Sequence, residues 1–226
     1  MNNYNSPEKI KKMFDEIAPK YDFMNNIISF GLHKFIKKSA VNKLKLKNGA
    51  KVLDLCCGTG DISKLLADKK EVEKVVGADF SITMLELAAA KNSHEKIQYI
   101  NADCLNLPFD DNSFDVVTIF FGLRNIPDKN GAINEIYRVL NPEGQVLHLD
   151  FQNGNRFFDF LFNFFAPLFA KVFSKNYDAY KYLVKTKRGF FKPDELKELF
   201  ALHNLNEKVS YDFLFSTISA QIFIKK

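Results

Sequence analysis

Between residues 50 and 151, five short apolar runs alternate with helical stretches, and this alternation constrains the fold more than any other feature. The runs are AKVLDLCC, VEKVVGAD, KIQYINAD, FDVVTIFF and GQVLHLDF, and between them lie DISKLLADKK, SITMLELAAAKN and DKNGAINEIYRVLN. Continuous apolar strands that alternate with helices are typical of a mostly parallel sheet covered on both faces. The sequence therefore predicts a doubly wound, Rossmann-like α/β fold, which binds ligands at the carboxyl ends of its strands.

The flanking segments predict further helices and a strand pair. Residues 6–46 indicate two helical regions: one starts at Ser6-Pro7 and stops at Ala18-Pro19, and the other covers about 23–44 with a break at Gly31. A Phe-rich segment from 151 to 173 predicts one long helix or two. A helix at 193–203 and two strands that meet near Ser216 complete the chain.

The length of 226 residues and the 46% of hydrophobic residues predict one domain. We expect an N-terminal helical lid (1–48), a cofactor-binding core (49–151), a helical substrate or membrane region (152–190), and a C-terminal helix and strand pair (191–226). The Phe-rich region is interrupted by charged and polar residues, so we expect no transmembrane helix.

Charge and cysteine content exclude several classes of protein. A net charge of +5 does not by itself indicate a nucleic-acid partner, and we predict none. The three cysteines include no CxxC pair and cannot form a disulfide framework, so we predict no metal site and a cytoplasmic location. The N-terminus lacks the apolar core of a signal peptide.

The stretch VLDLCCGTGD predicts a nucleotide-binding turn between a strand and a helix. Gly58 and Gly60 allow the backbone to turn tightly and approach a ligand, which the amide end of the next helix would face. A dinucleotide fingerprint requires a third glycine, and Ser63 stands in its place. Asp54 and Asp61 flank the turn. We expect these carboxylates to repel a pyrophosphate and to suit a ligand with a positive charge.

Two further strand ends carry polar groups. Asp79 lies 19 residues beyond Gly60, which is the spacing of an acidic residue that binds ribose hydroxyls. Asp103 and the backbone N–H of Cys104 follow the third strand and are placed to bind an adenine. With the turn at Gly58, Thr59 and Gly60, these groups indicate S-adenosylmethionine as the cofactor. The alternative is that each aspartate only caps a strand or turn, and Cys56 and Cys57 are interpreted as packing residues.

The chain resembles a known family, the ubiquinone/menaquinone-biosynthesis C-methyltransferases, which are class I methyltransferases. The resemblance covers nearly the whole chain. It is carried by MFDEIAPKYDFMNNIISFGLHK near the N-terminus, CCGTGD in the turn, FFGLRNIPDKNGAINEIYRVLNP after the fourth strand, and YKYL near residue 180. It implies methylation of a ring carbon of a prenylated hydroquinone, most simply demethylmenaquinol, or the corresponding benzoquinol of the ubiquinone pathway.

The catalytic residues follow from these blocks. Arg124 remains protonated, so we expect it to stabilise a phenolate or to orient a water molecule rather than to act as the base. Asn125 is expected to hold a hydroxyl group, and Tyr21 and Asp22 to close a lid over the cofactor. The alternatives are a salt bridge for Arg124 and a turn between helices for Tyr21 and Asp22. His33 is either an acid/base group or a structural residue.

The chain also departs from the family pattern. Ile36 stands where the family has Trp, Phe120 where it has a small polar residue, and Thr217 where it usually has Gly. Asn141, Asp150 and Gln152 stand where a basic residue, Glu and Ser are more frequent. These differences bear on the substrate pocket more than on cofactor binding.

The Phe-rich segment suits a polyprenyl tail or a peripheral contact with the inner face of the membrane. The alternative is that its phenylalanines pack on the sheet as ordinary core or form a homodimer face. Three alternative functions stay open. One is a methyltransferase for another small acceptor, one is a SAM-binding protein without turnover in a quinone-synthesis complex, and one is an NAD-dependent oxidoreductase, against which Ser63 and the acidic turn argue.

Overall fold

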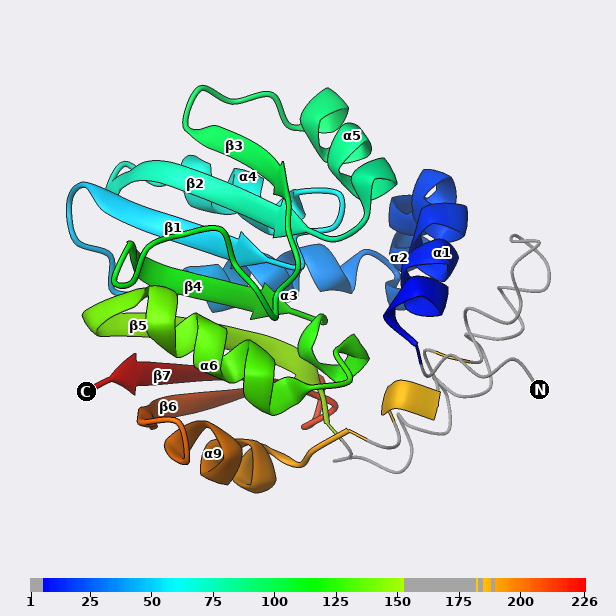
Figure 1. The fold of residues 1–226 in the computed structure, drawn as a ribbon. Coiled ribbons are helices and arrows are strands. Elements are labelled where there is room, and N and C mark those ends of the chain that lie inside the picture. The colour runs from blue at the N-terminus through cyan, green and yellow to red at the C-terminus, as the bar shows by residue number, and fades with distance from the viewer. Residues whose placement is uncertain (1–5, 153–181, 183–184, 188–189) are drawn as a thin grey trace.

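A seven-stranded sheet forms the centre of the protein (Figure 1). The computed structural model describes residues 6–152, 182, 185–187 and 190–226. The strand order is β3-β2-β1-β4-β5-β7-β6, with parallel neighbours from β3 to β5 and antiparallel pairing of β7 with β5 and β6. The strands are β1 (Ala50–Leu55), β2 (Val72–Asp79), β3 (Ile97–Asn101), β4 (Phe114–Phe120), β5 (Leu140–Phe151), β6 (Leu205–Phe213) and β7 (Ile218–Lys225). The predicted Rossmann-like, mostly parallel sheet is confirmed.

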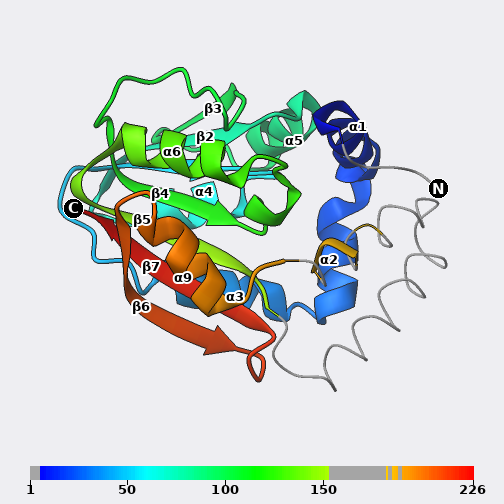
Figure 2. The ribbon, with the colours of Figure 1, turned by 60° about the horizontal axis from the view of Figure 1, so that its bottom comes forward.

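Helices cover both faces of the sheet, which explains the continuous apolar strands. On one face, α3 (Leu32–Val41) and α4 (Asp61–Ala67) pack Ile36 and Leu66 against Val52 of β1. On the other face, α6 (Lys129–Val139) and α9 (Pro193–Ala201) pack Ile136 and Phe200 into a core that includes Val117 of β4 (Figure 2). The helix α5 (Ile82–Lys91) contacts β2 and β3.

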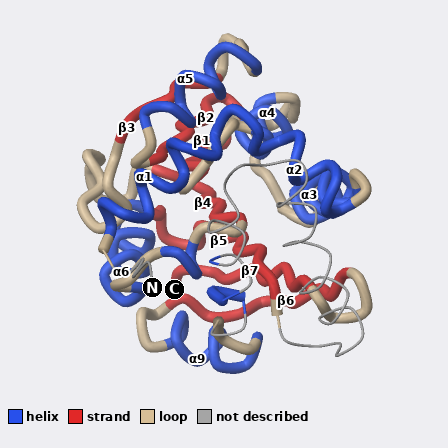
Figure 3. The backbone as a smooth tube through the Cα atoms, turned by 90° about the vertical axis from the view of Figure 1, so that its right-hand side faces the viewer, coloured by secondary structure: helices blue, strands red, loops and turns tan. Residues whose placement is uncertain are grey.

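The N-terminal helices lie beyond the carboxyl ends of the parallel strands (Figures 1 and 3). They are α1 (Pro7–Ile17), the short 3-10 helix η1 (Ala18–Lys20) and α2 (Tyr21–Ser29), which lead into α3. Ser6 caps α1 as predicted, because its hydroxyl accepts from the Lys9 N–H. The chain breaks between α2 and α3 where Phe30 and Gly31 both adopt left-handed backbone angles, with φ of 50° and 76°. The predicted break at Gly31 is confirmed.

One strand differs from the prediction. β5 begins at Leu140, ahead of the expected run at Gly144, because Leu140 already pairs with Phe114 of β4. The register then shifts, and Glu143 takes a positive φ of 61° inside the shift. The predicted helices of the Phe-rich segment fall almost wholly outside the described residues. Within the described residues, no helix combines the length and the apolar character needed to cross a bilayer.

Candidate functional site

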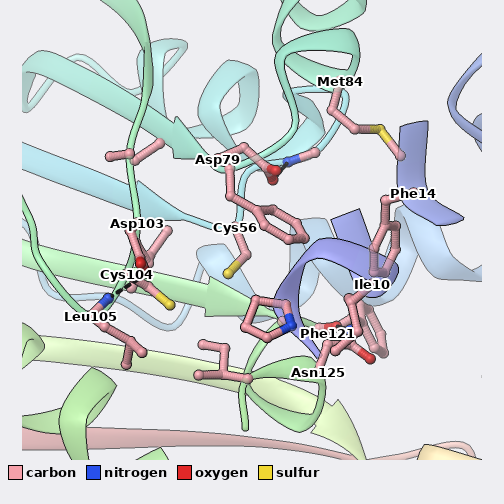
Figure 4. Close-up of a pocket in the computed structure, with 18 of the residues that line it drawn as sticks. Ile10, Phe14, Cys56, Asp79, Met84, Asp103, Cys104, Leu105, Phe121 and Asn125 are labelled. Atoms are coloured by element: carbon pink, nitrogen blue, oxygen red, sulfur yellow. Dashed lines mark hydrogen bonds between the residues drawn. The ribbon is translucent and has the colours of Figure 1, made fainter. Parts of the chain in front are cut away.

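A cavity of about 270 Å³ lies between the strand ends and the N-terminal helices (Figure 4). Its floor comes from the ends of β1 to β4, where parallel α/β sheets bind their ligands. Its opposite wall comes from α1 and the start of α2. Of the predicted site residues, Tyr21, Gly58, Asp79, Asp103, Cys104 and Asn125 line the cavity, whereas Asp22, Asp54, Thr59, Gly60 and Arg124 do not.

Asp79 ends β2 and holds the glycine turn in place. Its Oδ2 accepts from the Gly58 N–H at 2.9 Å, and its Oδ1 accepts from the Ser81 N–H at 3.0 Å. Burial raises the pKa of this carboxyl, and the two backbone donors act against that rise. Each carboxylate oxygen can accept a second hydrogen bond. Asp79 therefore presents a fixed pair of acceptors to the cavity.

The glycine turn requires its glycines for different reasons. Gly58 and Gly60 have φ of 53° and 79°, which side chains rarely tolerate. A Cβ on Gly60 would also collide with the Tyr99 hydroxyl. The Thr59 carbonyl accepts from the Asn92 side-chain amide at 2.8 Å, which ties the turn to the end of α5. Gly60 and Thr59 therefore shape the turn, and Gly58 is its residue at the cavity wall.

Asp54 lies behind the turn. It is 1% exposed, and it accepts from the hydroxyls of Ser63 at 2.6 Å and Thr118 at 2.8 Å. Burial raises the pKa of its carboxyl to about 6. The interpretation of Asp54 as a charge that faces the ligand is therefore not supported, because its oxygens point to hydroxyls inside the protein. Ser63, at the place of the third glycine, is a partner of Asp54.

Asp61 is also occupied by other residues. It pairs with Lys37 of α3 at 3.1 Å and with Lys91 of α5 at 2.5 Å. Burial raises the pKa of Asp61, but the two lysines outweigh this effect and lower it to about 2. The negative charge of Asp61 is thus neutralised locally. Of the three acidic residues around the turn, Asp79 alone reaches the cavity.

The end of β3 supplies the third group of the cavity. Asp103 Oδ1 accepts from the Leu105 N–H at 2.9 Å, which orders the loop that carries Cys104. Asn101 also lines the cavity, and its amide donates to the Asp79 carbonyl at 3.0 Å. The strand ends predicted to bind ribose and adenine are thus joined directly. Asn101 was missed because an Asn at a strand end is also a common turn residue.

The lid is fastened to the glycine turn by Asp22. Its Oδ1 accepts from the Thr59 hydroxyl at 2.7 Å, and its Oδ2 pairs with Lys91 at 2.6 Å. Tyr21, one residue earlier, lines the cavity. The two neighbours therefore differ in position: Tyr21 faces the ligand space, and Asp22 holds α2 against the turn and α5.

The loop after β4 contains a buried ion pair. Arg124 Nη1 donates to Asp150 Oδ1 at 2.6 Å and to the Phe121 carbonyl at 2.7 Å. The side chains of Arg124 and Asp150 are 5% and 0% exposed. Asn125 donates to the same carbonyl at 3.2 Å and lines the cavity. Arg124 therefore anchors the loop from behind, and Asn125 is the polar side chain that this loop offers to a ligand.

Burial favours the neutral forms of His33 and of the two cysteines in the turn. Burial and the nearby Lys37 lower the pKa of His33 to about 4, and its Nδ1 lies 2.7 Å from the Ser29 hydroxyl. Burial raises the pKa of the Cys56 and Cys57 thiols. Cys57 is buried, in keeping with its interpretation as a packing residue, whereas Cys56 lines the cavity with a φ of 57°.

Comparison with known proteins assigns the chain to a protein family. Residues 2–225 match the model of the ubiE/COQ5 methyltransferase family. The chain belongs to this family. A demethylmenaquinone methyltransferase from Staphylococcus epidermidis is 39% identical over 218 residues, which cover 93% of this chain and 90% of that protein. One from Staphylococcus carnosus is 41% identical over 208 residues, with 86% and 84% covered.

The fold agrees with this assignment. A Haloferax volcanii putative methyltransferase, solved with the Trm112 activator, superposes with a TM-score of 0.72 at 18% identity and covers 93% of this chain and 96% of its own. A SAM-dependent methyltransferase from Thermotoga maritima gives a TM-score of 0.70 at 18% identity, with 95% and 99% covered. The protein is a SAM-dependent methyltransferase of the class I fold, and its cofactor is S-adenosylmethionine.

Most departures from the family pattern have structural roles here. Ile36 packs in the core, Asp150 pairs with Arg124, and Gln152 donates to Asp212 at 2.7 Å. Thr217 is buried in the turn before β7. Phe120, at the end of β4, is the departure that lines the cavity among the described residues.

Proposed function

We propose that the protein transfers a methyl group from S-adenosylmethionine to a ring carbon of demethylmenaquinol. The observation that carries the proposal is the similarity, over most of the chain, to proteins named demethylmenaquinone methyltransferase. The cavity at the strand ends supports it, because it combines fixed polar groups with a mostly apolar wall that includes Ile10 and Phe14 of α1. Such a wall suits an aromatic ring.

The described residues fit the cofactor. We assign the ribose hydroxyls to Asp79, whose oxygens each have room for a further donor, and the adenine edge to Asp103 and the Cys104 N–H. The amino-acid end belongs at Gly58, which lines the cavity in the turn that Thr59 and Gly60 shape, before the first turn of α4. The bound cofactor supplies a methyl group on a positively charged sulfur.

The acceptor carbon needs activation. A hydroquinone that loses a hydroxyl proton spreads its negative charge to the ortho carbon, which then attacks the methyl group in line. The new carbon–carbon bond forms as the sulfur–carbon bond breaks, the sulfur keeps the electron pair, and the ring carbon then releases its proton. The chain must therefore hold the ring against the methyl group and stabilise a phenolate.

Four residues are proposed for this step. Asn125 lines the cavity and can donate to a substrate oxygen, and Tyr21 closes the ligand space from the lid. Asp22 keeps the lid in contact with Thr59 and Lys91, which excludes water from the site. Arg124 contributes its positive charge behind Asn125 and fixes the loop through the Phe121 carbonyl.

A long isoprenoid tail on the acceptor would partition into a lipid bilayer. We therefore propose that the protein acts from the cytoplasm as a peripheral protein on the inner face of the membrane.

The direct test is methylation by the purified protein. The protein should convert a short-tailed demethylmenaquinol and S-adenosylmethionine into the methylated quinol, which mass spectrometry of the extracted product detects. The corresponding benzoquinol of the ubiquinone pathway serves as the parallel acceptor and decides whether one or both rings are accepted. Binding of S-adenosylmethionine without methylation of either quinol would refute the proposal and favour another acceptor or a non-catalytic role.

A further inference from the structure

The hairpin of α2 and α3 exposes large apolar side chains at its tip. Phe30 is 82% exposed, Phe35 is 70% exposed and Leu32 is 47% exposed. The same two helices bury Met24 and Ile36 in the interior, so the exposed residues lie outside the face that packs on the protein. We call Phe30, Leu32 and Phe35 the apolar tip. Three large apolar side chains exposed on one helical hairpin indicate a contact with another apolar phase.

The charge of this region has one sign. From Phe23 to Leu53 the sequence contains seven lysines and no aspartate or glutamate. Lys34 and Lys38 are exposed on α3, one and three positions from Phe35, so they flank the apolar tip. Lys37 faces the protein instead, because it pairs with Asp61. The apolar tip thus stands in a positive surface with no nearby carboxylate in its own segment.

We propose that the apolar tip and the flanking lysines form the surface through which the protein binds an anionic phospholipid bilayer. Phe30, Leu32 and Phe35 would enter the headgroup region, and Lys34 and Lys38 would contact lipid phosphates. Aromatic residues and lysines on one short amphipathic segment bind such interfaces through both apolar burial and charge attraction. The proposal rests on the proposed function, whose acceptor carries a lipid tail.

The position of the hairpin links this surface to the cavity. Tyr21 begins α2 and lines the cavity, and Phe30 follows the last residue of the same helix. A helix of 9 residues spans roughly 14 Å. The lid that closes over the site is therefore the element that would rest on the membrane, so a lipid-anchored acceptor has a short path to the cavity.

A second copy of the chain fits this surface less well. A twofold dimer places the same patch of both subunits against each other. The positive surface that contains Lys34 and Lys38 would then meet the same positive surface of the other subunit, which is repulsive without an acidic partner. A bilayer with anionic lipids complements both the charge and the apolar side chains of the hairpin.

The test is sedimentation with vesicles of phosphatidylcholine, with and without phosphatidylglycerol. The wild type should bind the vesicles that contain phosphatidylglycerol more tightly than the vesicles of phosphatidylcholine alone. The double variant Phe30→Asn/Phe35→Gln should lower this affinity at least about tenfold, and Asn is suited to the left-handed position 30. Lys34→Gln/Lys38→Gln should lower it about 25-fold on anionic vesicles and change little on neutral ones.

Matched controls are available far from the hairpin. Leu202 is 78% exposed at the end of α9, and Lys70 and Lys74 are exposed at the opposite end of the sheet from the cavity. Leu202→Gln and Lys70→Gln/Lys74→Gln should bind vesicles as the wild type does. All variants should methylate a short-tailed acceptor in solution at the wild-type rate, which separates this proposal from the proposed function.

Two results would overturn the proposal. One is vesicle binding by both hairpin variants within about twofold of the controls. The other is a wild-type dimer in sedimentation velocity that Phe30→Asn/Phe35→Gln converts to a monomer, without vesicle binding by either protein. The second result would assign the hairpin to an interface between copies of the chain.

Discussion

Replacing Asp79 by Asn should abolish most cofactor affinity while leaving a folded protein. The carboxylate accepts from the backbone N–H groups of Gly58 and Ser81, and neither donor can rotate away. An amide would turn its NH₂ group toward one of them and leave that buried N–H without an acceptor, at a cost of about 1–3 kcal/mol in folding free energy. Where the amide faces Gly58, the glycine turn would lose its side-chain anchor on β2.

The loss of cofactor affinity follows from the hydrogen bonds between the ribose hydroxyls and Asp79. Two ribose hydroxyls that donate to a carboxylate contribute about 1.5–3 kcal/mol each, against about 0.5–1.5 kcal/mol each for hydrogen bonds with a neutral amide, so the variant should lose about 2–3 kcal/mol of binding free energy. At 1.4 kcal/mol for each factor of ten, the dissociation constant should rise about 30- to 150-fold. Titration calorimetry with S-adenosylmethionine and with its demethylated product, together with thermal unfolding, measures both effects.

Asp54→Asn is the matched control for Asp79→Asn. Asp54 is also a buried aspartate with two hydrogen-bond donors, but its donors are the hydroxyls of Ser63 and Thr118, which can rotate to accept from an amide. It does not line the cavity, so the variant should retain cofactor affinity within about threefold. Equal losses of affinity in the two variants, or near wild-type affinity of Asp79→Asn, would refute the assignment of the ribose site to Asp79.

Three further outcomes are expected. The pKa of Asp54 is raised in the folded state to about 6, so its contribution to stability improves as the pH falls from about 7 toward 4. The difference in Tm between the wild type and Asp54→Asn should therefore shift in favour of the wild type over this range. A difference that stays constant would contradict the argument that burial raises this pKa. Asp22→Asn should lower the Tm little, because the ion pair of Asp22 with Lys91 is partly exposed and contributes about 0.2–1 kcal/mol. The variant should speed cofactor release and the hydrogen exchange of backbone amides in α2. Unchanged exchange would show that Asp22 does not hold α2 in place. Arg124→Ala should destabilise the fold by about 3–5 kcal/mol and abolish turnover. Asp150→Asn keeps the guanidinium of Arg124 and should retain measurable turnover. Equal turnover in the two variants would show that Arg124 acts only through its ion pair with Asp150.

The sequence determined the architecture because its signals are local. Short, nearly continuous apolar runs such as Val52 to Leu55 indicate strands buried on both faces, and the helical segments between them indicate parallel order. The glycine turn and Asp79 were likewise found from spacing along the chain. These features depend on residues that are close in sequence or on a regular repeat, so they can be read without tertiary contacts.

Only the tertiary structure decided which polar residues face the ligand. Asp54 and Asp79 both lie near the carboxyl ends of buried strands, yet Asp54 accepts from Thr118 of β4 inside the protein whereas Asp79 reaches the cavity. The negative charge of Asp61 is balanced by lysines 24 residues before it and 30 residues after it. Arg124 meets Asp150 from the next strand. A side chain's role as ligand or anchor depends on partners brought by other elements, and sequence spacing contains no information on those distances.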